Sequence, residues 1–199
     1  MASYTKIDVA EAQIKCAVRL FFEDSHPIPV YTLACSAREI MTTLGEKLGV
    51  PTAVDELAKI MKAEKSDVYR RLHQFAGFMK HADRNPTATL EAFSDLDNDP
   101  VLFIAGKEFA RVADGMPIES QVFEAWYYAT KVERVAKGPV KWQRAVKACI
   151  RAFPRVRSVE RKEQKRIALT ELERALRDPR LEMKIKRTVE LAGLVEGPN

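Results

Sequence analysis

Residues 26–51, HPIPVYTLACSAREIMTTLGEKLGVP, contain a strong α-helical pattern. Apolar residues recur three and four positions apart, which is the spacing of one face of an amphipathic helix. Pro29 can occupy the first helical turn, and Gly49 followed by Pro51 ends the pattern. The apolar positions are Leu33, Ala34, Ala37, Ile40, Met41, Leu44 and Leu48. We therefore expect a helix over about residues 29–48.

The same period continues on both sides of this stretch and over almost all of the 199 residues. It predicts an all-α fold, a multi-helix bundle of about seven to nine helices. The other expected helices cover roughly residues 8–23, 53–61, 67–81, 99–115, 117–136, 140–153, 158–177 and 179–194. Ser66 or Asp67 is the expected cap of the helix over residues 67–81, and Asp99 that of the helix over residues 99–115. Residues 90–98 are the best candidate for irregular structure or a short strand.

Charge divides the chain into two unequal parts. Residues 1–130 contain 14 Lys and Arg against 19 Asp and Glu, whereas residues 131–199 contain 19 against 9, so the net charges are −5 and +10. We predict a helical core domain over residues 1–135 and a basic helical extension over residues 136–199. Such asymmetry points to nucleic acid or another acidic partner. A solvated cationic surface that docks on an acidic domain is the alternative.

Several protein classes are disfavoured by what the chain lacks. No apolar run is long enough to span a membrane, and the N-terminus has no secretory signal pattern. The three cysteines form no CxxC motif, which favours reduced thiols and a cytoplasmic location. We find no nucleotide-binding glycine motif and no histidine pair with zinc-ligand spacing, so we expect no cofactor and no metal.

The best nucleic-acid candidate is the basic stretch FPRVRSVERKEQKR, residues 153–166. Its cations are Arg155, Arg157, Arg161, Lys162, Lys165 and Arg166. Contacts from such side chains to phosphates are salt-sensitive and independent of base sequence. We therefore expect binding to RNA or DNA, or to an acidic protein, without a readable specificity.

A second candidate is FAGFMKHADRNP, residues 75–86. On one continuous helix, a line opposite the apolar face would hold Arg70, His73, Gly77, His81 and Arg84. His81 with Arg84 could act as an acid and base, and Lys80 could hold a phosphate. The bare backbone of Gly77 would let a second copy approach, which suits a homodimer. The alternative is a plain solvent face whose cations favour the helix C-terminus.

Two shorter patterns have competing interpretations. Arg19 and His26 are separated by six residues, which matches the loose arginine–histidine spacing of HEPN ribonucleases. A chance match is the competing interpretation, because His26 lies beyond the predicted helix end whereas the HEPN pair sits on a helix. Asp95, Asp97 and Asp99 alternate as in a calcium loop, but the glycine and distal glutamate of an EF-hand are absent. A capping turn is therefore the favoured interpretation of the three aspartates.

Residues of roughly 8–130 resemble a family of uncharacterised bacterial helical proteins. The matching pieces are IKCAVRLFFEDSHPIPVYTLACSAREI, FMKHADRNP and FEAWYY. The family pattern is an Asn-Phe-Phe-Lys-His-Ala-Asp-Arg-Asp-Pro run, in which Gly77, Met79 and Asn85 are the departures of this chain. A helix that ends in Lys-His also looks like some HEPN-type proteins, which implies metal-independent RNA cleavage by His81.

Three hypotheses follow from these patterns. The first is a cytoplasmic protein that binds nucleic acid through its basic C-terminal helices. The second is a HEPN-like endoribonuclease that uses His81 together with Arg84 or Arg70. The third is a non-catalytic adaptor that docks on an acidic protein. We favour the first, because a catalytic site would normally leave more trace than one histidine and its neighbouring cations.

Overall fold

The structure is a computed structural model that describes residues 2–81, 83, 86–131 and 140–181. It confirms the predicted all-α fold, because the regular elements of these residues are all helical. No helix within this described part is long and apolar enough to cross a membrane.

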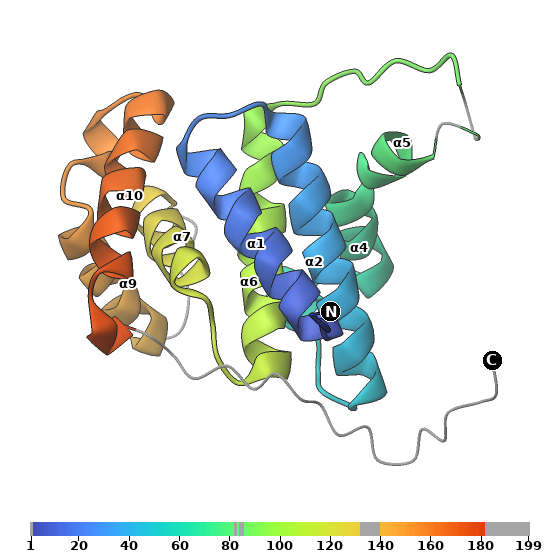
Figure 1. Cartoon of the computed structure of the whole chain (residues 1–199), viewed down its shortest axis with the longest axis horizontal. Coiled ribbons are helices and arrows are strands. Elements are labelled where there is room, and N and C mark those ends of the chain that lie inside the picture. The colour runs from blue at the N-terminus through green and yellow to red at the C-terminus, as the bar shows by residue number, and fades with distance from the viewer. Residues whose placement is uncertain (1, 82, 84–85, 132–139, 182–199) are drawn as a thin grey trace.

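Three long helices form the centre of the bundle. They are α1 (Lys6–Phe22), α2 (Pro27–Lys47) and α6 (Asn98–Ala113), which lie side by side in Figure 1. Gly45 permits the close approach of α2 and α6, since a Cβ atom at this position would lie 3.3 Å from Val112 Cγ2. Any larger side chain at Gly45 would require Val112 to move.

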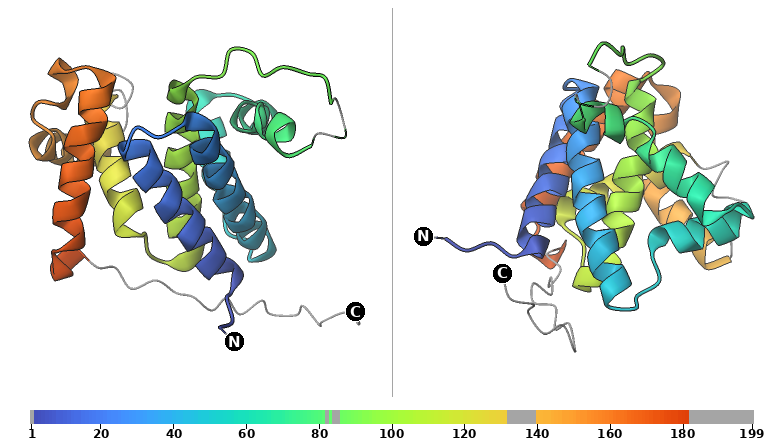
Figure 2. Two further views of the ribbon diagram at one scale, coloured as in Figure 1. Left: turned by 45° about the horizontal axis from the view of Figure 1, so that its top comes forward. Right: turned by 90° about the vertical axis from the view of Figure 1, so that its right-hand side faces the viewer.

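Shorter helices flank this centre on two sides (Figure 2). On one side lie α3 (Ala53–Met61), α4 (Lys65–His73) and α5 (Ala76–Lys80). On the other lie α7 (Ile118–Thr130), α9 (Val140–Ala152) and α10 (Arg161–Leu176). Single 3₁₀ turns cover Asp95–Asp97, Val156–Ser158 and Pro179–Leu181.

Side-chain caps explain where several helices begin. Thr5 forms a capping box with Asp8 at the start of α1, and Thr52 forms one with Asp55 at the start of α3. The helix α2 begins at Pro27, two residues earlier than expected. His26 Nδ1 accepts a hydrogen bond from the Ile28 N–H (3.4 Å), so the histidine caps this helix.

The prediction of a single helix over residues 67–81 is wrong, because the helix is interrupted between α4 and α5. The Tyr31 hydroxyl donates to the Leu72 carbonyl (3.0 Å), which would otherwise accept from the Ala76 N–H in a continuous helix. Phe75 packs instead on Tyr31 and Phe93, with ring centroids 5.8 and 5.0 Å away. A tertiary hydrogen bond and an aromatic cluster therefore override the local helical pattern.

Residues 90–98 contain a 3₁₀ turn rather than a strand. Asp97 forms a capping box with Ser94, and α6 then begins at Asn98 with Asp97 as its N-cap. The predicted cap Asp99 lies within the first turn of α6, where its side chain is buried. Asp97 therefore has the predicted capping role. Asp95 and Asp99 form ion pairs, which are described below.

One hydrophobic cluster joins the N-terminal and C-terminal helices. Its aromatic centre consists of Phe21, Phe22, Phe123 and Trp126, with Phe21 and Trp126 centroids 5.3 Å apart. The same cluster includes Phe153, Val156, Ala168 and Leu172. The described part of the basic extension therefore shares its core with residues of the predicted core domain. The predicted boundary at residues 135 and 136 lies outside the described residues.

Candidate functional site

Lys165, a predicted nucleic-acid contact, points into the protein. Its side chain is only 1% exposed, and its Nζ lies 2.9 Å from Asp24 Oδ1 and 2.7 Å from Asp95 Oδ1. The ammonium group also lies 4.5 Å from the centroid of the Phe21 ring. The charge of Lys165 is thus neutralised where α10 packs on the end of α1.

Arg161 belongs to the same internal network. Its guanidinium contacts the Asp95 carboxylate through Nε and lies 2.7 Å from Asp99 Oδ1 through Nη2. It also lies over Phe21 and Trp126, at 5.3 and 5.8 Å from the ring centroids. The carboxylates of Asp95 and Asp99 therefore bind cations of α10.

Burial of the Asp95 carboxyl, taken alone, would raise its pKa. Hydrogen bonds from Lys165 and Arg161, together with their positive charges, outweigh burial and lower the pKa of Asp95. The sequence contained a signal of the inward position of Lys165, because Lys165 shares the apolar stripe of α10 with Ala168, Leu172 and Ala175.

The other four predicted nucleic-acid contacts are exposed. Arg166 is paired with Glu163, with Arg166 Nη2 2.6 Å from Glu163 Oε1. Lys162 and Arg166 line a hollow of about 390 Å³ together with the carboxylates Glu23, Asp24, Glu160 and Glu163. The positive charge of Lys162 and Arg166 is therefore balanced locally. Arg155 and Arg157 are exposed beyond α9.

Two exposed cations of α9 were missed by the sequence analysis. Lys147 and Arg151 lie one turn apart, whereas Val146 and Phe153 are buried. No ion pair joins Lys147, Arg151 or Arg155 to an acid among the described residues. The signal was present in the sequence: eight Lys and Arg and no Asp or Glu occur between Glu133 and Glu160. We call the exposed cations on and just after α9 the α9 basic surface: Lys147, Arg151, Arg155 and Arg157.

A separate hollow of about 750 Å³ lies between α2 and the helices α4 and α5. We call it the α2–α5 hollow. Its lining includes Glu39 and Thr42 of α2, Tyr69 and His73 of α4, and Lys80 and His81 at the end of α5. Part of the predicted polar line is thus brought together, but on two short helices instead of one.

The remaining members of that line are arranged differently. Arg70 is exposed and pairs with Asp67 of its own helix, with 2.5 Å between Nη2 and Oδ1. A Cβ atom at Gly77 would meet no atom within 4 Å, so the described chain makes no close approach there. His81 is exposed, and its Nδ1 lies 3.9 Å from Asp83 Oδ1. Arg84, the proposed partner of His81, lies outside the described residues.

His73 is held between two charged groups in the α2–α5 hollow. Arg38 Nη2 donates to His73 Nε2, which leaves the imidazole proton on Nδ1, 3.4 Å from Glu39 Oε1. Burial, followed by the positive charge of Arg38, lowers the pKa of His73 to about 4. Lys80 closes the chain of contacts, since its Nζ lies 2.8 Å from Glu39 Oε2. His73 is therefore neutral near pH 7, and Arg38 occupies its acceptor nitrogen.

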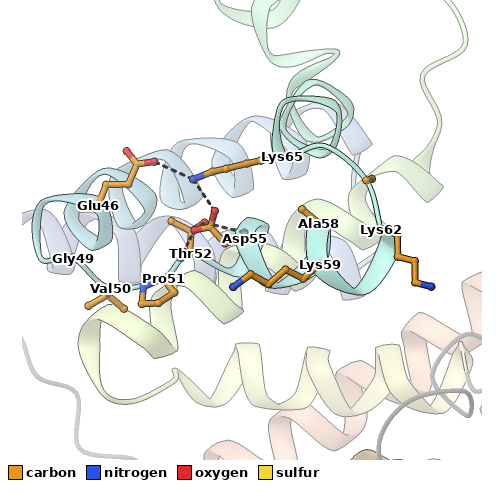
Figure 3. A pocket seen from close by; sticks show the side chains of 11 residues that line it. Glu46, Gly49, Val50, Pro51, Thr52, Asp55, Ala58, Lys59, Lys62 and Lys65 are labelled. Carbon is orange, nitrogen blue, oxygen red and sulfur yellow. Dashed lines mark hydrogen bonds and ion pairs between the residues drawn. The ribbon is translucent and has the colours of Figure 1, made fainter.

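A neighbouring hollow of about 660 Å³ lies beside α3 and shares Glu46 with the α2–α5 hollow. Lys65 lies between two carboxylates in Figure 3, with its Nζ 2.9 Å from Asp55 Oδ1 and 3.8 Å from Glu46 Oε1. Lys65 is thus already ion-paired with Asp55, and its positive charge also partly neutralises Glu46.

The other candidate patterns have structural roles in this fold. His26 caps α2, as described above, so its Nδ1 is engaged with the backbone. The alternating aspartates bind Lys165 and Arg161 or cap a turn. In the part of the chain that the structure describes, no group of three or more His, Cys, Asp or Glu side chains is arranged to hold a metal ion.

Comparison of the chain with protein-family models, with curated proteins and with solved structures finds no match.

Proposed function

We propose that the protein binds nucleic acid through the α9 basic surface. The observation that carries this proposal is the absence of any carboxylate from the sequence between Glu133 and Glu160, a stretch that holds eight cations. The four cations of the surface are exposed on the outside of the bundle. Exposed Lys and Arg side chains that are not balanced by nearby acids attract phosphates and release their counterions.

Not all of the predicted nucleic-acid contacts support this proposal. Lys165 and Arg161 are engaged with Asp24, Asp95 and Asp99, so they hold α10 in place rather than contact a ligand. Lys162 and Arg166 are exposed but surrounded by carboxylates. The proposal therefore rests on Lys147, Arg151 and Arg155, which have no ion pair with an acid among the described residues. Arg157 is exposed two residues further along the chain. These side chains would contact phosphates and would not read bases.

Binding of labelled duplex DNA and single-stranded RNA at two salt concentrations, with EDTA present, tests the proposal. If the α9 basic surface neutralises about three to four phosphates, affinity for duplex DNA falls about 40- to 150-fold between about 50 and 200 mM salt. Affinity for single strands depends less steeply on salt, since fewer counterions are released per contact.

A matched pair of variants locates the surface. The triple variant Lys147→Gln, Arg151→Gln, Arg155→Gln is expected to lose most of the binding and most of the salt dependence. The control variant Lys162→Gln, Arg166→Gln also removes exposed cations of the C-terminal helices but is expected to bind almost as the wild type does. Equal losses in the two variants would show that general positive charge, not the α9 basic surface, carries the binding.

The same assay tests the two alternatives. Cleavage of the RNA label that resists EDTA and disappears on His81→Ala would favour the endoribonuclease. Absence of binding even at low salt would remove both nucleic-acid functions and favour an acidic protein as the partner of these helices.

A further inference from the structure

Arg38 is a charged residue on the buried face of α2. Its side chain is 0% exposed, and it lies among the buried residues Ala34, Ala37 and Met41 of that helix. Its guanidinium carbon is 5.2 Å from the centroid of the Tyr69 ring, and its Nη2 contacts His73. Tyr69 and His73 both line the α2–α5 hollow, so Arg38 lies directly behind the wall of this hollow.

The guanidinium of Arg38 has unused hydrogen-bond donors. Neither Nε nor Nη1 has a partner among the described residues. Arginine remains charged inside proteins, and a buried charge without hydrogen-bond partners is strongly unfavourable. Such a group is tolerated when another molecule supplies the missing acceptors or when its position serves function.

The acids around Arg38 do not supply these acceptors. Glu39 is engaged with Lys80 and His73. Glu108 of α6 is 1% exposed and interacts electrostatically with Arg38 without a hydrogen bond to it, and its Oε1 has no partner in the described part of the chain. Burial raises the pKa of Glu108, although the backbone N–H groups of Ala53 and Val54 donate to it. Glu108 is thus a weakened counterion for Arg38.

Thr42 places a second unused donor on the same face of α2, one turn after Arg38. Its side chain lines the α2–α5 hollow but is only 6% exposed, and its Oγ1 has no described partner. The carboxylates at the mouth are both ion-paired, Glu39 with Lys80 and Glu46 with Lys65. An anion that enters the hollow therefore meets the unused hydroxyl of Thr42 in the lining and ion-paired acids at the mouth. The guanidinium of Arg38 lies behind the wall that Tyr69 and His73 form, and movement of His73 would expose it.

We propose that the α2–α5 hollow binds a small molecule through an oxyanion group, a carboxylate or a phosphate, which Arg38 and Thr42 receive. The oxyanion takes the place of His73 Nε2 on the guanidinium of Arg38, and the His73 side chain turns aside. A hollow of about 750 Å³ has the size of pockets that hold small molecules. This site lies on the opposite side of the central helices from α9 and is independent of nucleic-acid binding.

Thermal unfolding of the full chain in millimolar sodium phosphate, in millimolar sodium succinate and in sodium chloride of matched ionic strength tests this site. A ligand of the folded state raises the unfolding temperature by mass action. We expect phosphate or succinate to raise it above the chloride value, and the more effective anion identifies the chemical group. The triple variant of the α9 basic surface serves as a control and is expected to keep the whole increase.

Arg38→Met is the decisive variant, because methionine fills similar space without a charge. Without added anion this variant is expected to unfold at or above the wild-type temperature, since a buried charge with unused donors is removed. The increase caused by phosphate or succinate is expected to disappear. Arg70→Met, which removes an exposed guanidinium from α4, is expected to keep the increase.

Thr42→Val provides a test that does not depend on how well Arg38→Met folds. It removes one hydroxyl at nearly constant volume and is expected to reduce the anion-induced increase. His73 gives a direct signal, since its imidazole resonances are expected to shift on anion addition in the wild type and in Arg70→Met. The proposal is overturned if neither anion stabilises the wild type more than chloride does. It is also overturned if Arg38→Met and Thr42→Val both keep the full increase.

Discussion

Replacement of Lys165 by methionine tests whether the internal ion pairs hold α10 on the bundle. Methionine keeps an unbranched side chain against Phe21 but lacks the Nζ that lies 2.9 Å from Asp24 and 2.7 Å from Asp95. Asp95 would keep Arg161 as a partner, whereas Asp24 would lose the one ion pair described for it. The variant therefore leaves two carboxylates close together with one cation fewer between them.

The expected loss of stability follows from the exposure of the groups involved. Breaking a buried ion pair by removal of one partner costs about 3–5 kcal/mol when the other charge stays buried. Here the carboxylates of Asp24 and Asp95 are 39% and 29% exposed, so water partly replaces the ammonium group. We therefore expect Lys165→Met to lower the free energy of unfolding by about 2–3 kcal/mol, at or below the lower end of that range.

Urea unfolding followed by the fluorescence of the tryptophans measures this loss. Lys162→Met is the matched control, since Lys162 is exposed on the same helix three residues earlier, and its midpoint is expected to stay at the wild-type value. A midpoint for Lys165→Met that equals or exceeds that of the wild type would refute the reasoning. The desolvation of Lys165 would then cancel the attraction of the two aspartates.

The difference between wild type and Lys165→Met also depends on pH. The pKa of Asp95 is lowered in the folded protein, so its contribution to stability is present above the unfolded value of about 3.9. That contribution is lost as the pH falls through the lower folded value. The two unfolding midpoints are therefore expected to converge below about pH 4.

Two further predictions concern the helices on the other side of the bundle. Thr52→Ala removes the cap of α3, in which Thr52 Oγ1 accepts a hydrogen bond from the Asp55 N–H (3.1 Å). We expect this variant to lower the free energy of unfolding, measured in urea, by about 1 kcal/mol. Thr43→Ala serves as the control. An unchanged midpoint would show that the cap does not stabilise α3. The pKa of His73 is lowered to about 4 in the folded protein, below its unfolded value of about 6.5. Between these two values the unfolded state binds the proton and the folded state does not. Stability is therefore expected to fall as the pH drops from about 6.5 to about 4. Proton NMR titration of the imidazole is expected to show a midpoint near 4 that rises in Arg38→Met, and a midpoint near 6.5 in the wild type would contradict the contact with Arg38.

The helices themselves could be predicted from the sequence because their causes are local. Apolar spacing of three and four residues, proline in a first turn and glycine after a last turn act within one or two turns of the chain. The pattern over residues 26–51 predicted α2 to within two residues at its start. The break after α4 was missed, because Tyr31 takes the Leu72 carbonyl from 41 residues away.

Whether each charged side chain is exposed or is buried with a partner depends on the tertiary structure. Arg155 and Lys165 have the same sign in the same basic stretch, yet one is exposed and the other is buried between two aspartates. Those aspartates are 141 and 70 residues away from Lys165 in the sequence, and no local pattern shows that they meet it. The position of Lys165 and of Arg38 on apolar stripes was visible in advance, but their partners were not. Periodicity determines which face of a helix is buried, whereas the packing of distant helices determines which charges on that face are neutralised and which keep unused donors.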